Sequence, residues 1–453
     1  MKKSFLFYAL ALLIGFSMSF TSCKKKETVE PEPTPASSII EVTGEITSNT
    51  TWTADKKYLL KGFVYVVDGV TLTINPGTII KGDKTTMGTL IIERGAKIEA
   101  NGTASQPIIF TSNAPVSFRN RGDWGGVVIC GKAPVNQTNP QVEGGPRTVY
   151  GGTDPLDNSG TLKYVRIEYA GYPLMPDKEL NGLTFCAVGS STTIDYVMVS
   201  YSNDDSFEWF GGTVNCKHIV AYKGLDDDFD TDYGFMGKVQ FAVSLRDKNV
   251  ADISGSNGFE SDNDAAGSDN SPFTHPIFSN VSVFGPRASS STKDISANYK
   301  KGLHIRRNSR LCLYNSVIAG YLGGLLLDGT KCETNATNSD LQLQNVTIAG
   351  CTDASSFFSV ASSGATWSAS QVATWYLGAN NDTLMSNSSL KVTDPWGTTP
   401  NFLPLSNSPL LGTASFTNPN IATGFDVVSY RGAFGTTDWL SGWANFDPQN
   451  SAY

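Results

Sequence analysis

Two acid-rich segments contain the side chains whose types and spacing best suit chemistry. Asp204-Asp205 in the first segment and Asp226-Asp227 in the second are 22 residues apart, and each pair closely precedes a Phe that is followed by another acid. Carboxylates this close together must share protons, pair with cations or bind a metal ion. Oxygen-only ligands without the Cys or His spacing of a zinc site favour calcium, and a merely solvated acidic face is the alternative. The predicted calcium ligands are Asp204, Asp205, Asp226, Asp227, Asp228, Asp230 and Asp232.

The same acids, together with later basic residues, could instead cleave a glycosidic bond. Such cleavage requires a carboxylic acid and a carboxylate, with a charged helper nearby. A simpler interpretation of the basic residues is that they neutralise Glu260 and Asp262 on the preceding repeat, because structural ion pairs are commoner than active sites. The candidates for catalysis are Asp204, Asp205, Glu208, Glu260, His304 and Arg306.

Aromatic residues accompany the acids in sequence. Aromatic rings with polar neighbours suit contacts with sugars or proteins. Packing in the core is the alternative, and for Trp209 it is the preferred one. The candidate ligand-binding residues are Trp209, Phe210, Tyr222 and Tyr233.

A repeat of about 20 residues must position these side chains. A fixed period of this size in a turn-rich, β-rich sequence indicates a solenoid, whose coils bury their apolar sides against one another. Side chains alternate along a strand, and equivalent positions of stacked parallel strands lie directly above one another. The spacing therefore predicts an inward ladder of Phe207, Phe229, Phe259, Leu303 and Leu325. The outward positions are then Glu208, Asp230, Glu260 and His304, followed two residues later by Asp232, Asp262 and Arg306.

The same register places two cysteines on consecutive coils. Cys130 and Cys186 would be neighbours close enough for a disulfide in an exported protein. Reduced thiols that fill the stack are the alternative.

The composition limits the kinds of partner. The 453-residue chain has a formal net charge of −8, and its acids are clustered. Binding to nucleic acid requires a basic face, so nucleic acid is not an expected partner.

The N-terminus has the features of an export signal. Residues 1–22 combine a basic start, an apolar core and small residues before Cys23, which resembles a bacterial lipobox. Cys23 would then carry the lipid, and residues 23–42 would form a Pro-rich tether. In the Gram-negative lipoproteins that this segment resembles, the absence of Asp after the lipidated Cys implies the outer membrane. The sequence leaves open whether the body faces the medium or the periplasm.

Residues 43–360 are predicted to form the solenoid and residues 361–453 its end. Asn401–Leu411 is expected to be a final coil, and the aromatic tail from Tyr430 onward is expected to cover the open end.

The opening coils, Thr71–Gly77, Thr89–Gly95 and Pro107–Thr111, resemble those of right-handed parallel β-helices of the pectin-lyase-like group. The whole chain is similar to secreted β-helix lipoproteins of Bacteroidota. The resemblance implies an all-β right-handed parallel β-helix. Hydrolases of this group place an Asp pair before such a strand and a His and an Arg on later coils, so the resemblance also implies the catalytic roles considered above for Asp204, Asp205, His304 and Arg306. His304, however, lacks the Gly-His-Gly context of these hydrolases. We therefore expect a surface-anchored binding or structural module for a polysaccharide or protein, with a polysaccharide hydrolase or lyase as the alternative.

Overall fold

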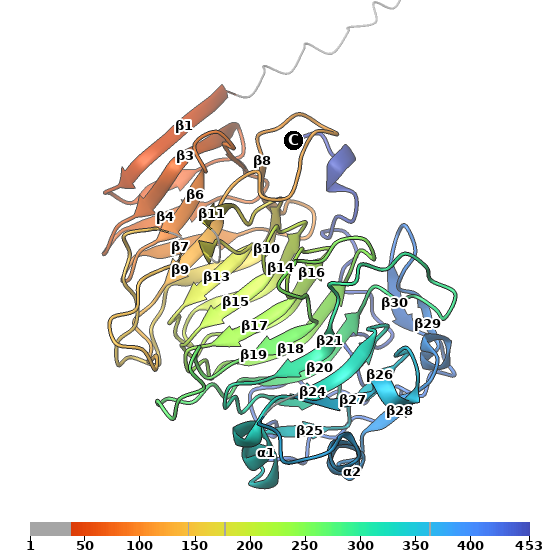
Figure 1. The fold of residues 1–453 in the computed structure, drawn as a ribbon. Coiled ribbons are helices and arrows are strands. Elements are labelled where there is room, and N and C mark those ends of the chain that lie inside the picture. Colours follow the sequence, from red (N-terminus) through yellow and green to blue (C-terminus); the bar gives the residue numbers. More distant parts are fainter. Residues whose placement is uncertain (1–37, 144, 176–177, 362–363) are drawn as a thin grey trace, which may run out of the picture. The chain divides into compact units, whose positions relative to one another are not determined.

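The computed structural model describes residues 38–143, 145–175, 178–361 and 364–453. The predicted signal sequence and Cys23 lie outside these ranges. Nearly all strands belong to one 26-stranded sheet in which each strand pairs in parallel with those one coil earlier and later. Figure 1 shows this stacking for β13, β15, β17 and β19. The predicted all-β parallel β-helix is confirmed.

The coils present three faces. Face I contains β2 (Thr50–Trp52), β4 (Thr71–Ile74), β7 (Lys97–Asn101), the first halves of five long strands, β22 (Cys312–Tyr314) and β25 (Gln342–Gln344). The five long strands are β10 (Gly160–Glu168), β14 (Thr193–Ser200), β16 (Asn215–Tyr222), β18 (Lys238–Leu245) and β20 (Ile277–Phe284). Face II continues with β5 (Ile79–Gly82), β8 (Ile108–Ser112), the second halves of the long strands, β23 (Val317–Ala319), β26 (Thr347–Ala349) and β28 (Asp382–Leu384).

Face III contains most of the candidate site residues. After the ends of β1 (Ser38–Ile46) and β3 (Lys56–Val66), it contains β6 (Thr89–Ile92), β9 (Gly126–Cys130), β13 (Leu183–Cys186), β15 (Phe207–Phe210), β17 (Phe229–Asp232), β19 (Phe259–Ser261), β21 (Lys301–Ile305), β24 (Gly323–Leu327) and β27 (Phe358–Val360). The other elements are the pairs β11 (Pro173–Met175) with β12 (Lys178–Glu179) and β29 (Val392–Asp394) with β30 (Asn401–Pro404), the helices α1 (Thr330–Thr337) and α2 (Ala369–Leu377), and short 3-10 turns at Ala354–Ser356, Asn387–Leu390 and Pro448–Asn450.

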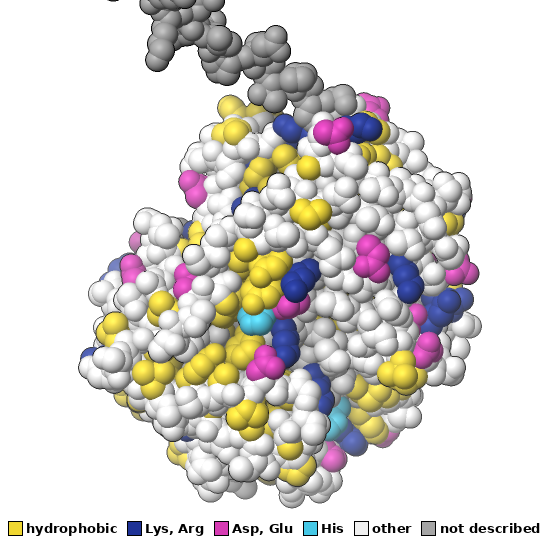
Figure 2. Space-filling model, turned by 180° about the vertical axis from the view of Figure 1, so that it is seen from behind, with side chains coloured by type: hydrophobic (Ala, Val, Ile, Leu, Met, Phe, Trp, Pro, Cys, Tyr) yellow, Lys and Arg dark blue, Asp and Glu magenta, His cyan; other side chains and the backbone are white. Residues whose placement is uncertain are grey.

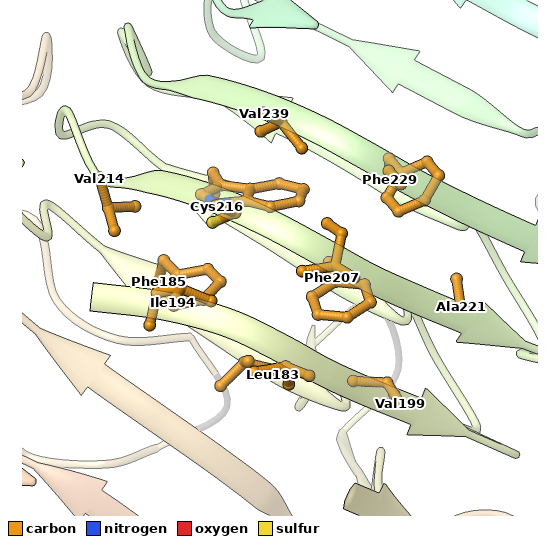
Figure 3. Close-up of a cluster of buried hydrophobic side chains, with 14 of the residues drawn as sticks. Leu183, Phe185, Ile194, Val199, Phe207, Val214, Cys216, Ala221, Phe229 and Val239 are labelled. Atoms are coloured by element: carbon orange, nitrogen blue, oxygen red, sulfur yellow. The ribbon is translucent and has the colours of Figure 1, made fainter. Parts of the chain in front are cut away.

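The inward ladder of face III has the predicted register. Phe207 pairs with Phe229, Phe229 with Phe259, and Phe259 with Leu303, and all four side chains are fully buried. Figure 3 shows Leu183, Phe207 and Phe229 on successive coils. Burying each such side chain contributes about 1.5–3 kcal/mol, so the ladder is a main source of stability and fixes the outward positions.

The C-terminal tail does not cover the open end, so that expectation is wrong. Phe434, Leu440 and Trp443 pack on the outward side chains of face II, such as Met198 and Val220, in one apolar cluster. The tail then returns to the early coils, where the end of the chain lies near β8 in Figure 1. The reason is that the outer surface of face II is apolar and needs a cover. The late coils are covered by α2, whose Val372 and Tyr376 belong to the main core.

Two boundaries also differ from expectation. Asn401–Pro404 does not start a final coil, because it pairs antiparallel with β29. The parallel strands instead run from Ser38 to Leu384, so the end of the expected tether is part of β1. Among the described residues, no helix has the length and apolar character needed to cross a bilayer.

Cys130 and Cys186 are neighbours in register, as predicted, but they are not bonded. Both are free thiols in an apolar cluster that includes Val128 and Tyr150. Burial raises the pKa of the Cys186 thiol well above its usual range, which keeps it in the unreactive protonated form.

Candidate cation-binding pocket

The outward ladder of face III brings the acids together. Glu208 pairs with Asp230, Asp230 with Glu260, and Glu260 with His304. The alternation of side chains along β15, β17, β19 and β21 points these residues away from the buried Phe and Leu ladder. The predicted side-by-side arrangement of these charges is therefore confirmed.

A second polar ladder lies two residues before the inward ladder. It consists of Asn181, Asp205, Asp227 and Asn257, all of which are buried. The Asp205 carboxylate accepts a hydrogen bond from the backbone N–H of Asp227 at 2.8 Å, and the Asp227 carboxylate accepts one from the N–H of Asn257. The Asp205 and Asp227 carboxylates thus each satisfy a backbone N–H of the next coil, which holds these two carboxylates in place.

The two ladders form the floor and wall of a cavity of about 410 Å³. Two insertions complete it: one contributes Glu143, and the other contributes Asp252 and Ser254. Ser254 donates a hydrogen bond to Asp226 at 3.1 Å and so joins the second insertion to the acidic floor. The remaining lining residues are Asn181, Asn203, Asp204, Asp205, Glu208, Leu225, Asp227, Asp230, Gly255, Glu260 and Arg306.

Three groups of carboxylates have ligand oxygens within 4.8 Å of one another. They overlap, because Asp205 and Asp230 each belong to two of them. The groups are Asp204, Asp205 and Asp226; Asp205, Glu208 and Asp230; and Asp227, Asp230 and Glu260. Such groups could hold a metal ion, and carboxylate and amide oxygens are ligands that calcium prefers.

The acids in this pocket resist ionisation. Burial, reinforced by the carboxylates nearby, raises the pKa of Asp205, Asp227 and Asp230 well above the ordinary value. Burial and the charge of Asp252 raise the pKa of Asp226 to about 7. A divalent cation among these groups would reverse this effect by favouring the ionised form.

Unused oxygen atoms support the fit of a cation. The Asn181 amide donates to Glu208, but its Oδ1 is buried and accepts no hydrogen bond. Among the described residues, one buried carboxylate oxygen of Asp226 and one of Asp230 likewise accept no hydrogen bond. Buried acceptors without donors are costly, and a bound cation would satisfy them.

Two predicted calcium ligands do not join these groups. Asp228 is fully buried on the other side of the strand and forms an ion pair with Arg246 at 2.9 Å. Asp232 follows the outward ladder but does not line the cavity. Asp228 is therefore a structural ion-pair residue, because its carboxylate is fully occupied by the guanidinium and by the Tyr321 hydroxyl.

His304 and Arg306 pair with acids, as the simpler interpretation expected. His304 Nδ1 lies 3.4 Å from Glu260, and its Nε2 lies 3.0 Å from Asp328. Burial acts to lower the pKa of His304, but the two carboxylates outweigh it and raise that pKa above the ordinary value. Arg306 contacts both Glu260 and Asp262.

Most of the candidate aromatic ligands are packing residues. Trp209 is fully buried between Phe185 and Phe235, so it offers no surface to a ligand. Tyr222 is buried under the C-terminal tail, and Phe210 packs in a separate apolar cluster. Tyr233 is half-buried against Phe210. The side chain of Trp209 points inward because its position has the same parity as Phe207.

Sequence reasoning missed several lining residues. The sequence could have predicted that Asn181 lines the pocket, because Asn181 lies two residues before the inward Leu183, just as Asp205 lies two residues before the inward Phe207. Glu143 and Asp252 lie on insertions of unequal length, for which no repeat spacing exists. The acidic pocket is a local feature: on the face shown in Figure 2, acidic and basic side chains are interspersed.

Comparison with known proteins identifies the domain. A family model described as a pectate-lyase-like β-helix domain matches residues 44–396, which is more than half of the chain. No curated protein and no solved structure matches significantly.

Proposed function

Since the chain belongs to the pectate-lyase-like β-helix domain family, we propose that it is a carbohydrate-binding module whose acidic pocket holds calcium. The family description points to carbohydrate, and a protein ligand is the other partner that a broad β-helix face suits. The binding role is favoured over catalysis because Arg306, the basic residue in the cavity lining, is engaged by Glu260 and Asp262.

One observation supports the calcium proposal above the others. Three overlapping carboxylate groups meet around Asp205 and Asp230, with an unpartnered amide oxygen of Asn181 beside them. Six or more oxygen ligands at flexible geometry are what calcium requires, and this pocket offers them from neighbouring coils. The ion would be held by Asp205, Asp230 and their neighbours, and it would supply positive charge for an oxygen-rich ligand.

Calorimetric titration with CaCl2, before and after removal of metal with EDTA, tests the calcium site. A glycan array in calcium and in EDTA then tests carbohydrate binding. We expect saturable calcium binding and glycan binding that requires it. No heat of binding with CaCl2 would refute the calcium site, and an array without any bound glycan would refute the carbohydrate-binding role.

A polysaccharide hydrolase or lyase is the second candidate, and the Asp226 carboxyl favours it. A group with a pKa of about 7 can donate or accept a proton near neutral pH. Assays for reducing ends and for unsaturated products decide between the two. Turnover that Asp205→Ala or His304→Ala abolishes would support the enzyme, whereas binding without turnover supports the module.

Anchoring through a lipid on Cys23 is part of the same proposal. The apolar segment and the small residues before Cys23 support it. The protein would then reside in the outer membrane. Mass spectrometry of the mature N-terminus tests the lipid, and Cys23→Ser is expected to release the protein from the membrane fraction. Retention of an unlipidated Cys23→Ser variant in that fraction would contradict the anchor.

A further inference from the structure

The outer surface of face II changes character along the stack. In the later coils its outward side chains are apolar and lie under the C-terminal tail. In the first coils the outward positions of β3 and β5 include Lys57 and Lys81 instead, because the residues that alternate with them belong to the core. Lys57 pairs in register with Ile79, and Lys81 pairs with Leu59. The two lysines are therefore diagonal neighbours on adjacent strands and point to the same side.

No acid neutralises these two lysines. Among the described residues, neither Nζ atom has a hydrogen bond or an ion pair. Burial and the positive charges of Lys57 and Arg119 lower the pKa of Lys81, and no carboxylate in the described part of the chain opposes them. Lys61, on the same side of β3, is by contrast paired with Glu41 at 2.6 Å. Like charges that are held together without a counter-ion favour the approach of an anionic partner.

Three apolar side chains are exposed beside the lysines. Ile39 is the register partner of Lys57 and is 56% exposed. Phe118 is 72% exposed and Val116 is 39% exposed, on the loop that leaves β8 with a backbone hydrogen bond to Gly82. Single exposed apolar residues are common, but these three flank one unpaired basic cluster.

The loop after β8 holds Phe118 in its exposed position. The Phe118 N–H donates to the Pro115 carbonyl at 3.0 Å, and the Asn120 amide donates to the Phe118 carbonyl at 2.9 Å. Arg119 is buried and donates to the Pro448 carbonyl at 2.7 Å. The backbone is therefore fixed on both sides of Phe118, and the ring is presented to solvent by a hydrogen-bonded turn.

The predicted tether joins the folded body at the same place. β1 begins at Ser38, which pairs with Lys56, directly before Lys57. Figure 1 shows β1 and β3 side by side at this end of the stack. Residues 24–37 separate Cys23 from Ser38, and a fully extended chain of this length spans at most about 50 Å. A lipid on Cys23 would therefore tether the body to the bilayer at the end that carries the two lysines.

We propose that Lys57 and Lys81, with Ile39, Val116 and Phe118, form a basal patch that docks the folded body on an anionic phospholipid surface. The lysines would contact lipid phosphates, and the apolar side chains would enter the boundary between the headgroups and the acyl chains. The orientation of the anchored protein rests on the lipid at Cys23 that is part of the proposed function. The affinity of the basal patch for anionic lipid does not, because the patch belongs to the folded body.

The first test measures binding to vesicles without the lipid anchor. It uses the chain from residue 23 onward with Cys23→Ser, which keeps every described residue, and vesicles of phosphatidylcholine with or without an equal part of phosphatidylglycerol. Sedimentation should show binding to the anionic vesicles only. The double variant Lys57→Gln/Lys81→Gln should bind these vesicles at least about tenfold more weakly, because each lysine near an anionic surface contributes to the attraction.

A matched control removes the same charge elsewhere. Lys293 and Lys300 are exposed on an insertion between later coils, so Lys293→Gln/Lys300→Gln should bind as the parent does. Residues 24–26 of the tether are lysines and are present in every variant. Their own attraction to the vesicles therefore cancels in the comparison.

The second test reports which side of the body meets the bilayer. The described cysteines are all buried, so an environment-sensitive fluorophore attaches selectively to Phe118→Cys or, as the control, to Ile253→Cys. Ile253 is 89% exposed, on the insertion that lines the acidic pocket. On anionic vesicles the emission from position 118 should shift to the blue, whereas that from position 253 should not.

Two results would overturn the docking surface directly. They are equal binding of the parent and of Lys57→Gln/Lys81→Gln to anionic vesicles, and a label at position 118 that does not respond to them. A blue shift at position 118 that grows with protein concentration in the absence of vesicles would show that a second copy covers the patch, which also overturns the proposal. An unmodified Cys23 in mass spectrometry would instead contradict the lipid anchor, and it would leave these results unchanged because the tested chain carries no lipid.

Discussion

Replacing Asp230 by Asn tests the electrostatics of the acidic pocket most directly. The ligand oxygen of Asp230 lies within 4.8 Å of those of Asp205 and Glu208 in one group and of Asp227 and Glu260 in another. Two unit charges at this separation repel by about 3 kcal/mol when the effective dielectric constant is about 20. Four such repulsions would consume most of a net stability of about 5–15 kcal/mol. Without a cation, the pocket must therefore retain protons.

The Asp230→Asn substitution removes these repulsions and also a carboxylate that two of the proposed calcium-ligand groups share. The calcium-free variant should be more stable than the calcium-free parent, by about 1–3 kcal/mol because retained protons already relieve part of the repulsion. The same variant should bind calcium at least about tenfold more weakly, since two ligand groups lose a carboxylate. The two effects have opposite signs, which a simple loss of folding cannot produce.

Calorimetric melting in EDTA and in CaCl2 measures both effects. In EDTA the midpoint of the variant should rise by a few degrees at most, because the enthalpy of a chain this long makes the midpoint insensitive. In CaCl2 the parent should gain more than the variant. Asp294→Asn, at an exposed position on an insertion, is the matched control. A variant that melts lower in EDTA and gains as much from calcium as the parent would refute the account.

Three further predictions follow from the same contacts. Because the pKa of Asp226 is raised to about 7, the contribution of this carboxyl to stability is present below about pH 4 and is lost as the pH rises through about 7. The calcium-free protein should therefore lose up to roughly 4 kcal/mol of its free energy of unfolding over this range, and calcium should reduce the loss. Thermal melts at several pH values, with and without calcium, measure both effects. Trp209→Ala should destabilise the protein by about 3–5 kcal/mol in urea unfolding, because the side chain is fully buried, and should leave the calcium affinity measured by calorimetry unchanged. If Trp209 instead contacted a ligand, the variant would bind glycan more weakly and have normal stability. Trp443→Ala should lower stability and expose the tail to proteolysis; a tail that resists protease as in the parent would show that its packing on face II is dispensable.

The register of face III could be predicted because two signals agree. The spacing from Phe207 to Phe229 sets the repeat, and strict alternation then places Glu208 and Asp230 on the outer surface. A slip by one residue would have put charges into the core, so few alternatives were possible. The ion pair of His304 with Glu260 followed from the same register, whereas its second partner, Asp328, was not predicted.

Other features depend on contacts that no repeat encodes. Asp252 lines the pocket from an insertion whose conformation depends on its own turns and on the hydrogen bond that the Ser254 hydroxyl donates to the Asp252 carboxylate. The tail was expected at the open end because it is aromatic, but it packs along a flank, where face II directs apolar side chains such as Met198 and Val220 outward and the tail buries them. Alternation alone could not show this, since the outward positions of face II are apolar as well.

The polar ladder explains why such an acidic pocket is compatible with a stable stack. Along successive coils it reads Asn181, Asp205, Asp227, Asn257 and Lys301. Like charges on adjacent strands are destabilising. The two neighbouring carboxylates, Asp205 and Asp227, are therefore flanked by neutral amides. The Asn181 amide donates a hydrogen bond to Glu208, and the Asn257 amide donates one to Glu260 at 3.3 Å. The ladder then changes sign at Lys301. A stack that only required stability could have carried apolar residues at these positions. Within this ladder the acids are instead confined to two adjacent coils, with an amide on each side and a lysine beyond Asn257, so the repulsion between its carboxylates is limited to the pair Asp205 and Asp227.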